Sequence, residues 1–342
     1  MLENQIVRKS SETSHIDKSG RIYFDSLQAL ADFESDIQTA KEETAHQDPR
    51  VSKYLQNARI LSKHGEYALA LNLLRQASNL DSKNPATLRM LAGALEKTGR
   101  NSEAQIVLNA WVKSDYGFES LLGLATSLYK MNRDQEALEK YYEALSVITE
   151  ENDELFELYK NMGNIFVRQG DFDAAEEFYN KAYTVNTQSD VLLVNFGTLE
   201  VQRGDFDKSL YCFRKAVEIN AENDKAWVGL AMVHNQFGDS ELAWANLESA
   251  LDINSKNRTA VHLAANWGVR DGRIHKAIES LEEYLSNVEE DEDMSLVLIN
   301  LFCTTGQMDK ASLEVERVLL WNPNNHEVRD LKKKINQSVK AA

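Results

Sequence analysis

Glycine recurs at a fixed interval along most of this 342-residue chain. Five successive glycines from Gly170 to Gly306 are spaced by 34 residues, and the same interval separates Gly65 from Gly99. The recurring positions are Gly65, Gly99, Gly170, Gly204, Gly238, Gly272 and Gly306. A period of roughly 20–50 residues is typical of stacked copies of one small structural unit. The interval therefore predicts a repeat array rather than a lone helical bundle.

Small residues accompany each glycine at constant offsets. Downstream of the glycines stand Ala70, Ala104, Ala175, Ser209, Ala243, Ala277 and Ala311. Upstream stand Ala58, Ala92, Gly163, Gly197, Ala231 and Ala265. Asn132 fills the one missing glycine position, with Ala125 and Ala137 at the matching offsets. The pattern predicts eight units, beginning near Val51, Pro85, Phe118, Phe156, Asp190, Asp224, Arg258 and Glu292.

Each unit is predicted to be a helical hairpin. Apolar residues fall at helical spacing before the glycine, as at Trp227 and Leu230, and again after it, as at Leu247 and Leu251. The glycine ends the first helix, because the residue there needs a left-handed conformation that Gly adopts freely and Asn tolerates. Small residues are expected where two helices cross closely. With only 3 prolines and many helix-forming residues, the chain is predicted to be all-α.

These features together resemble the tetratricopeptide-repeat (TPR) family. The resemblance rests on the 34-residue period, an aromatic residue at the fourth position (Tyr54, Tyr159, Trp227), Leu and a small residue at the seventh and eighth, and Ala late in the second helix. It covers residues 51–325. The resemblance implies a right-handed superhelical solenoid of about eight hairpins, in which first helices line a concave, peptide-binding groove. The family's late proline is present only as Pro323.

Three segments are expected along the chain. Residues 1–50 form a polar segment, with disorder over residues 1–20 and an amphipathic helix over Tyr23 to Glu43 that either caps the array or occupies the groove. The repeats occupy residues 51–325, and four extra residues in the third unit allow a break near 149–155. Residues 326–342 are expected to supply a capping helix and tail, because an array cannot leave its last apolar face open. Leu319 and Leu320 are expected to lie beneath this cap.

Composition and motifs exclude several function classes. A net charge of −16 repels phosphate backbones, which argues against nucleic acid. No apolar run is long enough for a transmembrane segment, and the N-terminus lacks the apolar core of a signal peptide. Cys212 and Cys303 match no metal or redox spacing, and a chain with so few thiols favours a cytoplasmic location. Without a phosphate-binding loop or a catalytic motif, no enzyme activity, cofactor or metal is expected.

Candidate binding residues lie on the first helix of several units, at positions that share the inward face. They are Lys160, Asn161, Asn164, Arg168, Asn195, Lys225, Asn235, His262, Asn266 and Asn300. Asparagine both donates and accepts hydrogen bonds, which suits the amide backbone of an extended peptide. Basic residues within an acidic protein favour an acidic segment or C-terminus as ligand. The sequence therefore predicts a non-enzymatic adaptor or scaffold that holds a peptide segment of a partner protein in the groove.

Two alternatives remain open at this point. TPR cochaperones bind a C-terminal carboxylate with Lys and Asn in one first helix, Asn in the next, and Lys and Arg in the third. Lys160, Asn164, Asn195 and Lys225 match these places, whereas Gly229 stands at the last. The resemblance thus implies a carboxylate-clamp protein that binds an acidic C-terminus. The other alternative is a self-assembling structural subunit, since the sequence does not determine the oligomeric state or the partner.

Overall fold

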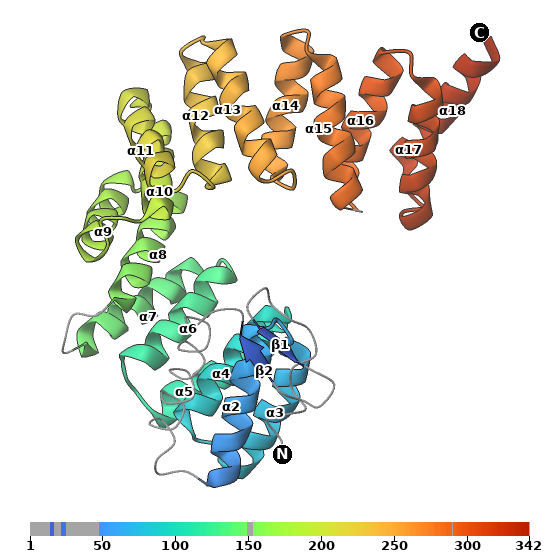
Figure 1. Ribbon diagram of the computed structural model, residues 1–342. Coiled ribbons are helices and arrows are strands. Elements are labelled where there is room, and N and C mark those ends of the chain that lie inside the picture. Colours follow the sequence, from blue (N-terminus) through green and yellow to red (C-terminus); the bar gives the residue numbers. More distant parts are fainter. Residues whose placement is uncertain (1–13, 17–21, 25–47, 149–152, 289, 342) are drawn as a thin grey trace. The chain divides into compact units, whose positions relative to one another are not determined.

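The fold is a succession of helices joined by short turns (Figure 1). A computed structural model describes residues 14–16, 22–24, 48–148, 153–288 and 290–341. The chain divides into two compact units, residues 1–169 and residues 170–342, which we call unit 1 and unit 2. The described residues contain 17 helices, and they confirm the all-α repeat fold predicted from the sequence.

Unit 1 contains a short β-hairpin and seven helices among its described residues. Its elements are β1 (Ser14–Ile16), β2 (Ile22–Phe24), α2 (Pro49–Lys63), α3 (Tyr67–Leu80), α4 (Pro85–Lys97), α5 (Asn101–Ser114), α6 (Phe118–Lys130), α7 (Asp134–Val147) and α8 (Glu154–Gln169). The pairs α2–α3, α4–α5 and α6–α7 are the first three predicted hairpins. The break expected near 149–155 stays a prediction, because residues 149–152 lie outside the described residues.

Unit 2 contains the helices that follow. They are α9 (Phe172–Val185), α10 (Asp190–Arg203), α11 (Phe206–Ile219), α12 (Asp224–Gln236), α13 (Ser240–Ile253), α14 (Arg258–Arg270), α15 (Ile274–Asn287), α16 (Glu292–Thr304), α17 (Met308–Trp321) and α18 (His326–Ala341). The helices α10, α12, α14 and α16 begin at the residues where the repeat pattern places the start of each unit. The 34-residue period therefore located these hairpins correctly.

The turn inside each hairpin has the left-handed residue that the sequence predicts. All seven recurring glycines have positive φ, for example 81° at Gly204. Asn132, with φ of 58°, is the one non-glycine residue with positive φ in the described part of the chain. Its side chain can stabilise a left-handed conformation that most L-residues avoid. The prediction that Asn132 replaces the missing glycine is confirmed.

Small residues are buried where helices meet, as expected. Ala243 and Ala250 of α13 are fully buried, and Leu247 is buried between them. Full burial of a leucine side chain contributes about 1.5–3 kcal/mol to folding. Ser209 of α11 is also fully buried, and its hydroxyl donates to the backbone oxygen of Gly197 at 2.9 Å. The small residues thus allow close approach of helices whose larger neighbours form the core.

Loops between hairpins are fastened by a recurring set of polar contacts in unit 2. The first acidic residue of a helix accepts hydrogen bonds from two asparagines in the loop that ends the same hairpin. The sets are Asp190 with Asn220 (2.7 Å) and Asn223 (2.8 Å), Asp224 with Asn254 (2.6 Å) and Asn257 (2.9 Å), and Glu292 with Asn322 (2.9 Å) and Asn325 (2.5 Å).

In one hairpin the donor and the acceptor of this loop contact have exchanged positions. Arg258 occupies the place of the acidic residue, and Asp291 occupies the place of the second asparagine. Arg258 Nε donates to Asp291 Oδ2 at 2.7 Å, and its Nη2 donates to Asp293 Oδ2 at 2.8 Å. The contact between helix start and loop is preserved, although the residues that donate and accept have changed sides.

The last helix packs as a cap. Val328 and Ile335 of α18 are buried against a core cluster that includes Val315 and Val318 of α17. Leu319 packs on the same cluster. Leu320, in contrast, is 83% exposed, so the expectation that it lies beneath the cap is wrong. Successive residues of a helix point in different directions, and only one of this leucine pair can face α18.

The N-terminal segment differs from its prediction. Strands β1 and β2 pair antiparallel, with Ser14 opposite Phe24 and Ile16 opposite Ile22. Disorder is therefore wrong for residues 14–16, and the helix expected from Tyr23 is wrong at its start, because Tyr23 lies in β2. β-branched and aromatic residues such as Ile22, Tyr23 and Phe24 favour extended backbone. The rest of that predicted helix, residues 25–43, lies outside the described residues.

Candidate peptide-binding site

A recess of about 630 Å³ lies on the first helices of unit 2, along α10, α12 and the start of α14. We call it the α10–α12 recess. Its apolar lining residues are Val194, Val201, Phe213, Val228, Gly229 and Met232. Its polar lining residues are Asn195, Thr198, Asp224, Lys225, Asn254, Lys256, Asn257, Arg258 and Thr259. Ligand sites combine apolar side chains with polar groups that orient the ligand, and this recess contains both kinds.

The recess depends on the ring of Phe213, which comes from α11 and is 3% exposed. The ring packs against two glycines, Gly197 of α10 and Gly229 of α12. A Cβ atom added to Gly197 would lie 2.7 Å from the ring, and one added to Gly229 would lie closer still. Real Cβ atoms essentially never approach so closely, so both positions require glycine for this packing. The two glycines let an aromatic ring sit between neighbouring first helices.

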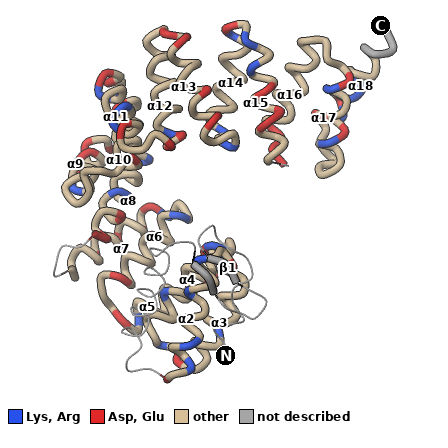
Figure 2. Tube along the Cα trace, in the orientation of Figure 1, with Lys and Arg blue, Asp and Glu red and all other residues tan. Residues whose placement is uncertain are grey.

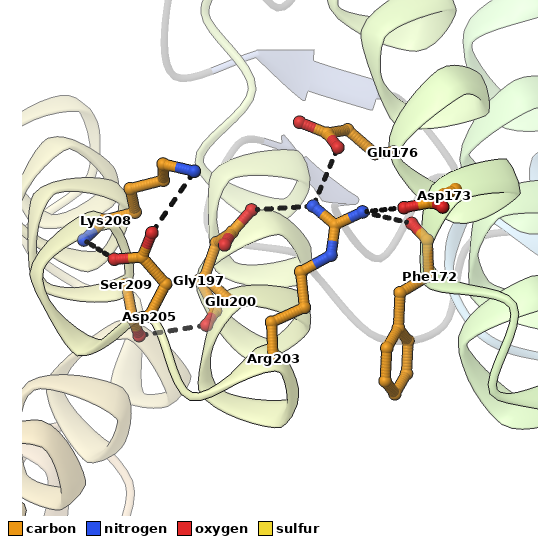
Figure 3. A network of polar contacts seen from close by, with 9 residues as sticks. All are labelled: Phe172, Asp173, Glu176, Gly197, Glu200, Arg203, Asp205, Lys208 and Ser209. Atoms are coloured by element: carbon orange, nitrogen blue, oxygen red, sulfur yellow. Dashed lines mark hydrogen bonds and ion pairs between the residues drawn. The ribbon is translucent and has the colours of Figure 1, made fainter.

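Helix α10, which forms one wall of the recess, is fastened to α9 through Arg203 (Figure 3). Arg203 Nη1 donates to Glu176 Oε2 at 2.7 Å, and Nη2 donates to Asp173 Oδ1 and to the backbone oxygen of Phe172, both at 2.9 Å. Nη1 also donates to Glu200 Oε1 at 3.3 Å. Figure 3 shows the Ser209–Gly197 contact on the other side of the helix. Fixed helices hold a binding site more precisely than loops do.

Positive charge is available at one side of the recess. Arg258 is already paired with Asp291 and Asp293, and Asp224 is occupied by Asn254 and Asn257. Lys225 and Lys256 are exposed and form no ion pair with any residue that the structure describes. Along the described helices acidic and basic positions are interleaved (Figure 2). The two lysines are therefore the basic groups of the recess that have no ion pair among the described residues, and the Asp224 carboxylate keeps its negative charge beside them.

A second recess, of about 750 Å³, lies between α9 and α11 and has a different character. Tyr183 and Tyr211 line it and are exposed. Its lysine, Lys215, is paired with Glu218 at 2.5 Å. None of the binding residues predicted from the sequence lines this second recess. The α10–α12 recess is the stronger candidate because it combines predicted residues with available charge.

The structure brings two of the predicted residues of unit 2 together and leaves four elsewhere. Asn195 and Lys225 both line the α10–α12 recess. Asn235 is half-buried on α12, outside the recess lining. The exposed residues His262 and Asn266 of α14 contact each other, with Asn266 Nδ2 3.3 Å from His262 Nδ1. Asn300 is exposed on α16.

The four predicted residues of unit 1 all lie on α8, and each has a partner within that unit. Lys160 pairs with Glu157 at 2.6 Å. Asn164 Nδ2 donates to Tyr129 Oη at 3.0 Å, and the Arg168 guanidinium pairs with Asp134 and lies over the Tyr129 ring. The hydrogen bond to Asp134 raises the pKa of Arg168 further above its ordinary value.

Asn161 is used inside the fold. Its side chain is 4% exposed, and its Nδ2 donates to Tyr141 Oη at 3.1 Å. Burial raises the pKa of Tyr141 to about 12, so that hydroxyl stays protonated and donates to Thr126. The inward face predicted from helical spacing therefore includes one position that packs instead of facing a ligand.

Sequence reasoning missed most of the recess. Phe213 lies on a second helix, and the groove prediction considered only first helices. Asn254, Lys256 and Asn257 belong to a loop between hairpins. One signal was present: the spacing Asn-x-x-Asn recurs at 220 and 223, 254 and 257, and 322 and 325. That recurrence marks loop residues with a shared structural role.

The free cysteines are poor nucleophiles. Burial raises the pKa of the Cys212 thiol to about 11 and raises that of Cys303 as well. Both thiols therefore stay protonated at neutral pH, and the thiolate is the reactive form.

Within the described residues no group of three or more His, Cys, Asp or Glu side chains is arranged to hold a metal ion. Nor does any helix there combine the length and apolarity needed to cross a membrane.

Sequence comparison identifies one family over most of the chain. Models described as tetratricopeptide repeat match residues 61–128 and 269–335, residues 118–188, and residues 194–258. Together the matched segments cover well over half of the sequence. Among curated proteins, none matches this chain.

Solved structures give the same picture of the fold. The crystal structure of the APC/C hetero-tetramer Cut9-Hcn1 aligns with a TM-score of 0.61 at 16% identity, over 80% of this chain and 52% of that chain. This chain thus spans about half the length of that one. A tetratricopeptide repeat protein from Parabacteroides merdae gives 0.60 at 19% identity, over 74% of this chain and 99% of that chain. Pseudomonas aeruginosa pilF gives 0.54 at 16% identity, over 64% and 98%. At such identities the likeness shows the fold alone.

Proposed function

The chain belongs to the tetratricopeptide-repeat family, and on that premise we propose that it is a non-enzymatic scaffold that holds a peptide segment of a partner protein in the α10–α12 recess. Stacked repeats present extended surfaces that proteins of this architecture use for binding other proteins. The observation that carries the proposal is that Asn195 and Lys225 line one recess together with apolar residues such as Val228 and Met232.

Three physical features support a peptide as the ligand. A volume of about 630 Å³ lies within the range of roughly 300–1,000 Å³ that is usual for ligand sites. Asn195 can donate to a peptide carbonyl and accept from a peptide N–H. Lys225 can pair with a carboxylate of the ligand, which fits the acidic segment that the sequence favours.

Free thiols at Cys212 and Cys303 support a reducing, cytoplasmic location as part of this proposal.

The carboxylate-clamp alternative receives less support. Its last basic residue would stand at Gly229, where the Phe213 ring leaves no room for a side chain. Its first two residues, Lys160 and Asn164, have partners at Glu157 and Tyr129 within unit 1. We therefore propose recognition of an internal or terminal acidic segment without the complete clamp.

Selection of displayed peptides against the 342-residue chain tests the proposal. Selected peptides are titrated against wild type, Asn195→Ala and Lys225→Ala, with Asn300→Ala as the control on a helix outside the recess. A hydrogen bond to a charged group contributes about 1.5–3 kcal/mol, so Lys225→Ala should weaken binding roughly ten- to hundred-fold. Asn195→Ala should weaken it less, and Asn300→Ala should leave it unchanged.

Peptides that bind both recess variants as tightly as wild type would contradict the proposal. Helicity measured by far-UV circular dichroism verifies that each variant is folded. The self-assembly alternative makes a different prediction. The molar mass of the protein, measured by light scattering, should then rise with protein concentration, and no displayed peptide should bind the recess.

A further inference from the structure

We infer that the α10–α12 recess selects a segment in which an apolar side chain stands close to an acidic residue, the apolar group contacting the exposed side chain of Met232 and the carboxylate pairing with Lys225 and Lys256. This inference rests on the proposed function and specifies the chemistry of its ligand. It follows from how apolar and charged groups are distributed within the recess.

The apolar part of the recess depends on how Phe213 packs and on the exposure of Met232. Phe213 can occupy the space between α10 and α12 because Gly197 and Gly229 have no side chains. Met232 of α12 lines the same recess and is 40% exposed, although it is a large apolar residue. Methionine is flexible and polarizable, and it adapts to ligands of different shape. An apolar side chain of a ligand would remove this exposed thioether from water.

The charged part lies on the same recess. Lys225 comes from α12 and Lys256 from the loop before α14, and both line it. Neither forms an ion pair among the described residues, whereas the neighbouring Arg258 is held by Asp291 and Asp293. Asp224 also lines the recess and keeps its negative charge, because its partners Asn254 and Asn257 are neutral. Together with Asp224, the two lysines without ion pairs leave a positive charge in the recess, which is complementary to an acidic ligand in a chain with a net charge of −16.

The two features together define a short recognition element. Apolar contact without charge would fit many segments, and charge without apolar contact would be screened at physiological salt. Their combination within one recess of about 630 Å³ fits a segment of a few residues that carries both groups. Met232 and the two lysines are therefore assigned as specificity-determining residues of the binding site, and the buried Phe213 ring supports them from beneath.

Selection from a randomised nonapeptide library, displayed with both ends blocked by fusion or amidation, tests this inference. Wild type should enrich peptides that have Leu, Ile, Met or Phe within about three positions of Asp or Glu. Lys225→Glu together with Lys256→Glu should reverse the charge preference and enrich Lys or Arg instead. Lys181→Glu, a charge reversal on α9 outside the recess, should keep the wild-type preference.

A second variant isolates the apolar contact. Met232→Ser should lower the affinity of the selected peptides roughly tenfold, whereas Leu242→Ser, at an exposed leucine of α13, should not. Rising salt should weaken binding to wild type and have less effect on a peptide in which Asn replaces the acidic residue.

The outcomes separate this inference from the proposed function. The inference is overturned if the selected peptides lose affinity with Asn195→Ala but show no preference for acidic residues. It is also overturned if the double lysine variant selects acidic residues as wild type does. In both cases the proposed function still stands. Failure of Met232→Ser to weaken the selected peptides overturns the apolar assignment. If neither the asparagine nor the lysine variants affect any selected peptide, both proposals are wrong.

Discussion

At the scale of single residues, the candidate site depends on two glycines that flank one aromatic ring. Gly197 and Gly229 occupy helix interiors, where glycine normally lowers stability relative to alanine. The packing of Phe213 against both of them explains why alanine is absent from these positions. A residue type that is unfavourable for the helix is thus favourable for the contact between helices.

Substitution of Gly229 tests this explanation. Gly229→Ala should destabilise the protein by about 1–3 kcal/mol, because the new methyl group overlaps the Phe213 ring and forces it to move. Gly93→Ala is the matched control, since Gly93 is exposed within α4 and has no atom within 4 Å of an added Cβ. It should stabilise by roughly 0.5–1 kcal/mol. Urea denaturation measures both, and the same sign for the two variants would refute the packing argument.

At the scale of elements, the contacts between helix starts and loops fix how successive hairpins join. Burial raises the pKa of Asp190, but the hydrogen bonds from Asn220, Asn223 and the backbone N–H groups at the start of α10 together outweigh burial and hold the pKa below its ordinary value. At Asp291 the hydrogen bond from Arg258 is the largest cause of a lowered pKa. The Asp291 carboxylate also accepts from the backbone N–H of Met294 at 3.2 Å, which caps α16. One carboxylate thus serves both as a helix cap and as a link between hairpins.

Acidification should weaken the contact at Asp291. Its pKa is lower in the folded protein than the value of about 3.9 in an unfolded chain, so ionised Asp291 stabilises the fold above about pH 4. That stabilisation is lost as the pH falls through the folded pKa. Asp291→Asn should therefore be less stable than wild type by about 1–3 kcal/mol at pH 7, with the difference shrinking toward pH 3.

Denaturant unfolding of the full chain at several pH values measures this difference. Asp252→Asn, at an exposed position of α13, serves as the control and should change stability by less than about 0.5 kcal/mol. A stability difference for Asp291→Asn that stays constant between pH 7 and pH 3 would show that the charge of Asp291 does not contribute.

At the scale of the whole molecule, stability comes from contacts between successive helices. Repeat arrays lack a single shared core, and each repeat depends on its neighbours. The last hairpin therefore needs a cover, and α18 supplies Val328 and Ile335 to the cluster that contains Val315 and Val318. The polar residues of α18, among them Lys333 and Lys334, are exposed. Helix α18 thus covers the apolar cluster of the preceding hairpin with its apolar face and exposes its polar face to water.

Removal of residues 326–342 should promote aggregation. Loss of α18 would expose the apolar surface of Val315, Val318 and Leu319, whereas Leu320 is exposed already. Each fully buried aliphatic side chain that is lost contributes about 1.5–3 kcal/mol. Size-exclusion chromatography and binding of an apolar dye measure the effect. Removal of residues 338–342 alone retains Val328 and Ile335 and should behave as wild type; equal behaviour of the longer truncation would contradict the capping role.

The sequence by itself determined the repeat period, the hairpins and the turns. These features are local: helical periodicity acts within one helix, and a left-handed turn selects Gly or Asn at one position, as at Gly204 and Asn132. For the same reason the starts of α10, α12, α14 and α16 coincide with their predicted residues. The family followed from the period, because few architectures repeat at this interval.

Only the tertiary structure decided which residues of the inward face are available. Helical spacing places Asn161 and Lys225 on comparable faces, but Asn161 is bonded to Tyr141 inside the fold whereas Lys225 lines a recess. The recess itself arises where α11 inserts Phe213 between two helices, a contact set by the relative positions of three elements. Side-chain contacts between hairpins depend on helix orientation and on the neighbouring side chains, and no single helix encodes them. That is why the fold could be predicted from the sequence, and why the site became visible only in the packed structure.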